Sequence, residues 1–309
     1  MGLGLLVLWV GALQIMFDKG RELDWFNSGL ITFLGITALA GFAFFIAWEL
    51  TERHPIVDLS LFRRRTFTMA VIPFSFSFAL FFGNLVILPL WLQQTMGYTA
   101  TWAGLFTAPI GILALILSPM VGRNLTRVDP RRIATIAFVT FGITSLMRSR
   151  FNTDIDATVI VLPQFIQGIA MAAYFVPLTA ILLNGIPHDQ VPLASGLSNF
   201  LRLTGGAFGT SIATTLWDDR TSAYHARLVE HITPYDATPA VAIGKLNSPG
   251  LDGLQALGLV DRLVNTQAAM LAAADFFYIA GWLMFALIPL IWLAPVKIAS
   301  AAPAPTGEH

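Results

Sequence analysis

The chain has 309 residues, of which 56% are hydrophobic and 12% are charged. Soluble domains carry about 25% charged residues, so this composition excludes an ordinary soluble domain and predicts a membrane protein with several spans. The 18 basic and 18 acidic residues cancel, so no basic field indicates nucleic acid as a partner, and the lack of cysteine excludes disulfides and thiolate chemistry.

Eight apolar stretches are long enough, or nearly so, to cross a bilayer as a helix, which takes about 20 residues. The first, residues 2–17, begins at Met1 with no basic residue before Lys19, so we interpret it as a span without its opening turn rather than a signal peptide. The predicted fold class is an all-α polytopic membrane protein with about eight transmembrane helices. The other stretches are residues 28–50, 67–93, 101–122, 132–150, 157–184, 190–217 and 268–294.

Basic residues in the short connections orient the spans, because cytoplasmic loops are enriched in Lys and Arg. Nine basic residues lie in connections 51–66 and 123–131, at the start of the following helix and in the tail. The short connections on the opposite side hold four basic residues: Lys19, Arg21, Arg148 and Arg150. Both termini are therefore predicted to be cytoplasmic, with 218–267 a long extracytoplasmic loop. Leucines at helical spacing in 251–266 predict an amphipathic helix. We favour the interpretation that this helix covers the protein's own surface over the alternative that it is a docking site for a partner.

Arg202 lies near the middle of a predicted span, where an arginine costs about 2.5–3.5 kcal/mol. It stands on a stripe of small and polar residues at helical spacing, which indicates close packing against other helices or a wet cavity. Two interpretations of Arg202 stay open: hydrogen bonds to helix carbonyls that fix the bundle, or a functional role. The stripe consists of Ser195, Asn199, Arg202, Gly206, Gly209 and Ala213.

Other polar residues also fall inside predicted spans. Asp275 lies roughly 9 Å from the centre of the last helix, and indicates either proton exchange or a hydrogen-bonded carboxylate near the interface. A second polar face suits a cavity for amphipathic compounds, although hydrogen bonds between helices are the alternative for each amide, including Asn84. That face consists of Gln164, Gln167, Met171 and Tyr174, between Pro163 and Pro177.

Motifs of enzymes and metal sites are absent from the sequence. It contains no HExxH, Walker loop or GxSxG, and the five histidines form no cluster at metal-ligand spacing. We therefore predict neither an enzyme nor a bound metal or cofactor.

Residues 122–132, Gly-Arg-Asn-Leu-Thr-Arg-Val-Asp-Pro-Arg-Arg, resemble a degenerate copy of the loop motif of the major facilitator superfamily, G-x-x-x-D-R-x-G-R-[RK]. Gly122, Arg127 and Arg131 match this motif, whereas Thr126 and Asp129 depart from it. Longer segments are similar to the EmrB/QacA-type multidrug exporters, the fourteen-span drug:proton antiporters of that superfamily. These segments are residues 13–28, 48–68, 97–123, 163–179 and 194–217.

This resemblance implies an exporter in the bacterial cytoplasmic (inner) membrane that exchanges amphipathic drugs for protons, driven by the proton gradient. It also implies an EmrA-like periplasmic adaptor and an outer-membrane channel as partners, besides membrane lipid. Residues 1–66 would be two linker spans and a cytoplasmic loop, 67–300 the C-terminal six-helix bundle, and 301–309 a cytoplasmic tail.

The N-terminal six-helix half would then be missing. Alternating access needs two bundles that move around a shared site, so the chain is not expected to transport alone. The alternative is a non-transporting half-protein, either a scaffold or the remnant of a broken gene. As one wall of the cavity, the chain is expected to place these residues on the substrate and ion pathway: Asn84, Gln164, Gln167, Tyr174, Asn199, Arg202 and Asp275.

Overall fold

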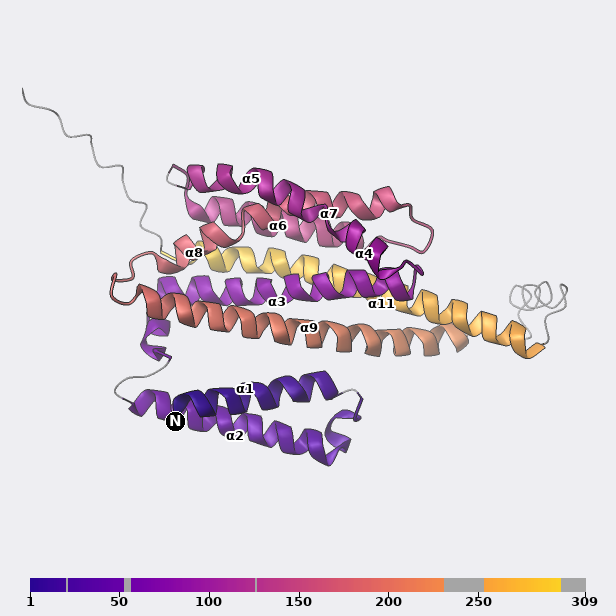
Figure 1. Ribbon diagram of the computed structural model, residues 1–309, viewed down its shortest axis with the longest axis horizontal. Helices are drawn as coiled ribbons and strands as arrows, with labels where there is room; N and C mark the ends of the chain where they lie inside the picture. Colours follow the sequence, from indigo (N-terminus) through magenta and orange to yellow (C-terminus); the bar gives the residue numbers. More distant parts are fainter. Residues whose placement is uncertain (21, 53–56, 126, 231–252, 296–309) are drawn as a thin grey trace, which may run out of the picture.

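The computed structural model describes the chain as a set of packed helices joined by turns (Figure 1). Six helical segments in the described part are long and apolar enough to cross a membrane, as expected of a multi-pass membrane protein. These are Gly2–Lys19, Gly29–Thr51, Arg65–Gln94, Ala100–Asn124, Ala157–Leu183 and Gly258–Trp292. The structure describes all residues except 21, 53–56, 126, 231–252 and 296–309, so the predicted tail 301–309 lies outside it.

Helices also cover the two remaining predicted stretches. α6 (Pro130–Arg148) carries arginines at both ends, and α9 (Val191–Glu230) is rich in Gly, Ser and Thr, so both are less apolar than the other six. Both pack against apolar helices: α9 runs along α3 (Arg65–Gln94) and α11 (Gly253–Trp292), and α6 lies against α11. Each of the eight predicted stretches is therefore helical, and a total of eight membrane crossings stays a prediction.

Two of the six apolar segments are interrupted helices. Pro177 explains one interruption, because a proline ring clashes with the carbonyl four residues earlier, here that of Ala173, where the helix ends. Bends at such points are tolerated in membrane helices when neighbouring groups satisfy the freed backbone. The two pairs are α4 (Ala100–Thr107) with α5 (Ile110–Asn124), and α7 (Ala157–Ala172) with α8 (Phe175–Leu183).

The first two helices form a hairpin beside the other helices (Figure 1). α1 (Gly2–Lys19) packs against α2 (Gly29–Thr51), and α1 also contacts α9. At that contact Gln14 Nε2 donates to Ser211 Oγ over 3.2 Å, and the Ser211 hydroxyl bonds to the Asp18 carboxylate. The hairpin is therefore attached to α9 through polar side chains as well as apolar ones.

Two clusters of buried apolar side chains form the core. One contains Phe78 of α3 and Ala170 of α7, and the other contains Ile87 of α3 and Ile160 of α7. Buried Asn84 of α3 lies in sequence between Phe78 and Ile87, and buried Gln164 and Gln167 of α7 lie between Ile160 and Ala170. A polar layer therefore separates the two apolar clusters.

The prediction of a long loop over residues 218–267 is wrong at both ends. α9 continues to Glu230 and α11 begins at Gly253, so only residues 231–252 are left, and they lie outside the described part. A helix of 40 residues is about 60 Å long, roughly twice the hydrocarbon thickness, so α9 is long enough to extend well beyond the membrane. Polar composition does not distinguish a solvated helix from a loop, so the prediction of a loop was wrong for residues 218–230 and 253–267.

The predicted amphipathic helix 251–266 belongs, from Gly253 onward, to α11 and is continuous with the last span. Leu259 and Leu263 are 43% and 56% exposed, whereas Val264 is buried. Leu259 and Leu263 therefore do not pack on the protein's own surface, and Val264 marks the face of α11 that packs inward. The side chains of Leu251, Leu254 and Leu257 lie outside the described part.

Candidate functional site

A buried arginine joins three helices in the polar layer. Arg148 is the last residue of α6, and its side chain is 1% exposed. Its guanidinium donates to Asn84 Oδ1 of α3 over 3.3 Å and also donates to Gln167 Oε1 of α7. Asn84 Nδ2 in turn donates to the Leu80 carbonyl oxygen over 2.9 Å, which turns the amide oxygen toward the arginine. Two of the predicted site residues, Asn84 and Gln167, are thus brought together.

Arg148 is the functional candidate that the sequence analysis missed, because it was counted as a residue of a short external connection. The amide oxygens of α3 and α7 take the place of water around the guanidinium, which allows the end of α6 to lie inside the protein. Helical spacing in the sequence could have indicated that Arg148 is buried, because Arg148 shares one face of α6 with three other residues and all four are buried. These residues are Phe141, Thr144, Ser145 and Arg148.

Gln164 lies on α7 one turn before Gln167 and is 5% exposed. It lines a cavity of about 20 Å³ together with Asn84, Arg148 and Gln167. The polar face predicted for residues 157–184 therefore does line a cavity at Gln164 and Gln167, but this cavity is small and lies inside the helix bundle.

Tyr174 stands at the interruption between α7 and α8 and is buried. Its hydroxyl lies 2.6 Å from Ser77 Oγ and donates to the Phe74 carbonyl oxygen over 2.9 Å. The Tyr174 ring also packs edge-to-face on Phe74, with ring centres 5.4 Å apart. These contacts agree with the alternative of hydrogen bonding between helices and tie the interrupted helix to α3.

Arg202 of α9 is held by aromatic rings. Its guanidinium carbon lies 5.0 Å from the centre of the Phe78 ring and 5.2 Å from the centres of Phe74 and Phe175. It also donates to Asn199 Oδ1 over 2.6 Å, and Asn199 is exposed. Rings attract a cation within about 6 Å of their centres, so they offset the cost of this charge in place of the expected helix carbonyls.

Gly209 and Ala213 of the stripe on α9, together with Gly205 beside the stripe, pack closely against α3. A Cβ atom at Gly209 would lie 2.6 Å from Ala79 Cα, and one at Gly205 would lie 2.9 Å from the Ser75 carbonyl oxygen. A Cβ at Gly83 would lie 3.0 Å from Ala213 Cβ, so the two helices present small residues to each other at four-residue spacing. Of the two interpretations of this stripe, close packing against another helix applies at Gly209 and Ala213.

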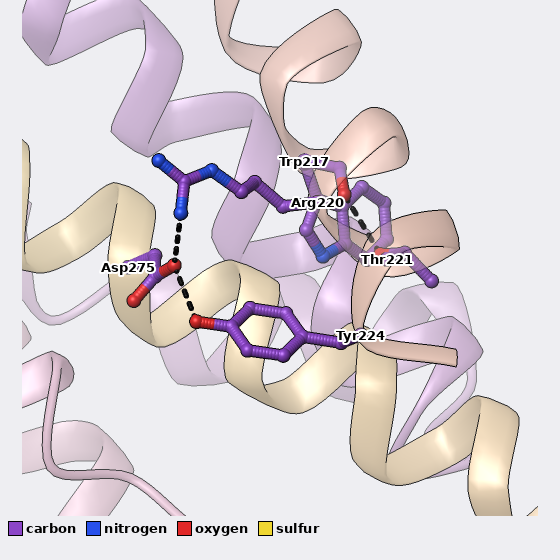
Figure 2. A network of polar contacts seen from close by, with 5 residues as sticks. All are labelled: Trp217, Arg220, Thr221, Tyr224 and Asp275. Carbon is purple, nitrogen blue, oxygen red and sulfur yellow. Dashed lines mark hydrogen bonds and ion pairs between the residues drawn. The ribbon is translucent and has the colours of Figure 1, made fainter. Parts of the chain in front are cut away.

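Asp275 of α11 lies in a polar network with the C-terminal part of α9, as Figure 2 shows. Its carboxylate accepts from Arg220 Nη1 over 3.0 Å and from the Tyr224 hydroxyl over 2.7 Å. The hydrogen bond to Asp275 raises the pKa of Tyr224, so the phenol is neutral and donates at neutral pH. Nearby, Trp217 Nε1 donates to the Ala269 carbonyl oxygen over 2.9 Å, which adds a second link between α9 and α11.

The predicted site residues thus fall into three groups. Asn84, Gln164 and Gln167 surround Arg148; Tyr174 is linked through Phe74 to Arg202 and Asn199; and Asp275 lies apart in the outer network. The Asp275 carboxylate accepts hydrogen bonds from Arg220 and Tyr224, which agrees with the interpretation of a hydrogen-bonded carboxylate. A role in proton exchange stays a hypothesis.

Comparison with known proteins gives the family. The model of the Major Facilitator Superfamily matches residues 1–210. The chain belongs to this superfamily. It is 44% identical over 293 residues to the fatty acid resistance protein FarB of Neisseria gonorrhoeae, which covers 95% of this chain and 58% of FarB. It is 42% identical over 294 residues to the multidrug export protein EmrB of Escherichia coli (strain K12), which covers 95% of this chain and 57% of EmrB.

The resemblance to EmrB-type exporters is thereby confirmed, and the chain spans somewhat more than half the length of these relatives. The fold is similar to that of a bacterial homologue of the human lysosomal transporter Spinster, crystallised in an inward-facing and unoccupied conformation. The TM-score is 0.52 at 14% identity, and the likeness covers 96% of this chain and 70% of that one.

The segment that resembles the loop motif of the major facilitator superfamily connects α5 and α6. Gly122 lies near the end of α5, Arg127 is exposed in the connection, and Arg131 lies in the first turn of α6. Asp129 Oδ1 accepts from the Arg131 backbone N–H over 2.9 Å and caps the helix, with Pro130 as its first residue. The departure from the motif at Asp129 therefore has a structural reason, since an aspartate caps a helix better than a glycine.

Proposed function

We propose that this chain forms one six-helix bundle, α3 to α11, and the adjoining α1–α2 hairpin of a proton-coupled exporter of amphipathic compounds. The observation that carries the proposal is the identity of 42–44% over 95% of the chain to two proteins named for multidrug export and fatty acid resistance. No observation favours the alternative of a non-transporting scaffold or remnant.

The wall of the substrate cavity would lie on the side of α9 that bears Asn199 and Arg202. Asn199 is exposed and Arg202 is partly exposed over aromatic rings, so a compound could reach both. Phe78 and Phe175 supply apolar surface at the same place, and this combination suits molecules with an apolar body and a polar group. By contrast, Asn84, Gln164, Gln167 and Tyr174 are buried and would act on substrate only through the position of α3 and α7.

A single bundle does not transport in this account. The second bundle would face Arg202 and the aromatic rings, and rocking of the two against each other would open the wall to each side in turn. Protons moving down their gradient would drive this exchange, without a bound cofactor.

The membrane would be the bacterial inner membrane, with both termini in the cytoplasm. Arg64 Nη2 donates to Gln190 Oε1 over 3.0 Å, and Arg64 Nη1 donates to the Gly185 carbonyl oxygen over 3.3 Å. Arg64 and the connection after α8 therefore lie on the same side of the helices, as the predicted alternation of spans requires. On the opposite side, the outer parts of α9 and α11 would be the first surfaces met by a periplasmic adaptor, which would lead to an outer-membrane channel.

The proposal is tested in a chimera of E. coli EmrB in which this chain replaces the stretch with which it aligns. Everted membrane vesicles energised with a proton gradient should accumulate a drug that EmrB exports, and collapse of the gradient should stop accumulation. Replacing Arg202 with Ala in the chimera should lower transport at equal abundance, whereas Gly196→Ala, on an open face of α9, should not. A chimera present at wild-type abundance that moves no drug would contradict the proposal.

A further inference from the structure

Arg148 is a buried cation without an acidic partner. Its hydrogen-bond acceptors are the amide oxygens of Asn84 and Gln167, and no Asp or Glu in the described part of the chain forms an ion pair with it. Removing a charge from water costs several kcal/mol per ion unless an opposite charge compensates it. Arg202, in contrast, is partly exposed and lies over three aromatic rings, so its charge is offset in another way.

Two polar groups next to the Arg148 charge have no partner within the described part of the protein. The Arg148 Nε–H is buried without a hydrogen bond. The Gln164 side chain is 5% exposed, and no hydrogen bond to its amide is found among the described residues. Both side chains line the cavity of about 20 Å³ in the polar layer. Both of these side chains, Arg148 and Gln164, therefore border the same small space.

The size and walls of this cavity restrict what it can hold. A volume of about 20 Å³ holds about one particle of the size of a water molecule. The hydroxyl of Thr107, also at this cavity, already donates to the Gly104 carbonyl oxygen over 2.9 Å. Asn84 and Gln167 are neutral amides and the remaining walls are apolar, so the guanidinium is the only charge at the cavity among the described residues. These apolar walls are Phe81, Leu85, Leu88 and Ile110.

We propose that Arg148 and Gln164 bind a monatomic anion of the chloride class in this cavity. Water could accept the two hydrogen bonds, but only an anion also neutralises the guanidinium, and the interaction of two opposite charges is strong where water is excluded. The anion would join α6 to α7 and, through Asn84, to α3. It would thereby stabilise the bundle, and this role is independent of the proposed transport function.

The test uses the purified full chain in detergent micelles, with sodium gluconate replaced stepwise by sodium chloride or bromide at constant ionic strength. Gluconate is too large for the cavity, so the thermal unfolding midpoint should rise by a few degrees and saturate with either halide. Gln164→Leu keeps Arg148 and removes one donor, and should raise the halide concentration for half-saturation by about tenfold or more. Arg148→Gln should abolish the response, and the matched variant Arg202→Gln should keep it.

Equal midpoints in gluconate and chloride would overturn the proposal, as would a full halide response in Arg148→Gln. If Arg148→Gln does not fold, Gln164→Leu decides: an unchanged half-saturation concentration would overturn the proposal, and a raised one supports it. Crystals grown in bromide should show an anomalous scattering peak between the Arg148 and Gln164 side chains, and its absence at saturating bromide would likewise count against the site.

Discussion

The Arg202 guanidinium carbon lies 5.0 Å from the centre of the Phe78 ring, which places the charge of α9 on an aromatic face of α3. Such pairs contribute about 0.5–2 kcal/mol, with the larger values where water is excluded. We predict a coupling energy in this range from a double-mutant cycle of Arg202→Gln and Phe78→Leu, measured by thermal or denaturant unfolding in micelles. Additive effects of the two substitutions would show that the ring does not stabilise the charge.

Close packing of α3 and α9 predicts a large difference between two glycine substitutions on the same helix. A Cβ at Gly209 would lie 2.6 Å from Ala79 Cα, whereas a Cβ at Gly196 would meet nothing within 4 Å. Gly209→Ala should therefore destabilise the protein by about 1–3 kcal/mol, because overpacking forces the backbones apart. Gly196→Ala should be neutral or stabilise the protein by up to about 1 kcal/mol, because alanine favours a helix interior over glycine. Similar unfolding midpoints for the two variants would refute the proposed contact.

The Asp275 network predicts a structural rather than a coupling role for this acid. The Asp275 and Arg220 side chains are 32% and 46% exposed, so their ion pair contributes at most about 1 kcal/mol. Asp275→Asn in the EmrB chimera should thus lower stability slightly and leave proton-driven export within a few-fold of the parent. Arg220→Gln is the matched control and should behave in the same way. Loss of export with Asp275→Asn alone, at unchanged abundance, would instead assign proton exchange to Asp275.

The same network predicts a shifted tyrosine titration. The hydrogen bond to Asp275 raises the pKa of Tyr224, so its stabilising effect is complete below the ordinary tyrosine pKa and is lost as pH rises through the raised value. Asp275→Asn should move this titration to lower pH. Tyrosinate absorbance measures the shift when the spectrum of Tyr224→Phe is subtracted. An identical titration with and without the carboxylate would contradict the assignment.

The helical spans were predictable because hydrophobicity over about 20 residues depends on local sequence. Local spacing also identified Gln164 and Gln167 as one polar face, and the structure has them at one cavity. The interruption at Ala173 follows from Pro177, which the sequence also displays.

The partners of the polar residues could not be predicted, because they come from other helices. The rings around Arg202 belong to α3 and α8, and the amides around Arg148 belong to α3 and α7. Counting basic residues by loop treats an arginine at a helix end as solvated, so it assigned Arg148 to the wrong environment. The length of α9 was missed because polar residues outside the membrane occur in helices and loops alike.

The assignment of α3 to α11 to the C-terminal bundle stays a prediction, since the matched share of 57–58% describes length and not position. It is tested together with the central claim, that this chain is one bundle of a two-bundle exporter. The chain is co-expressed with either end fragment of E. coli EmrB in cells lacking EmrB, and energised drug efflux is measured. We predict efflux with the N-terminal fragment and none with the chain alone. Efflux by the chain alone, or no efflux with either fragment when both proteins are in the membrane, would contradict the account.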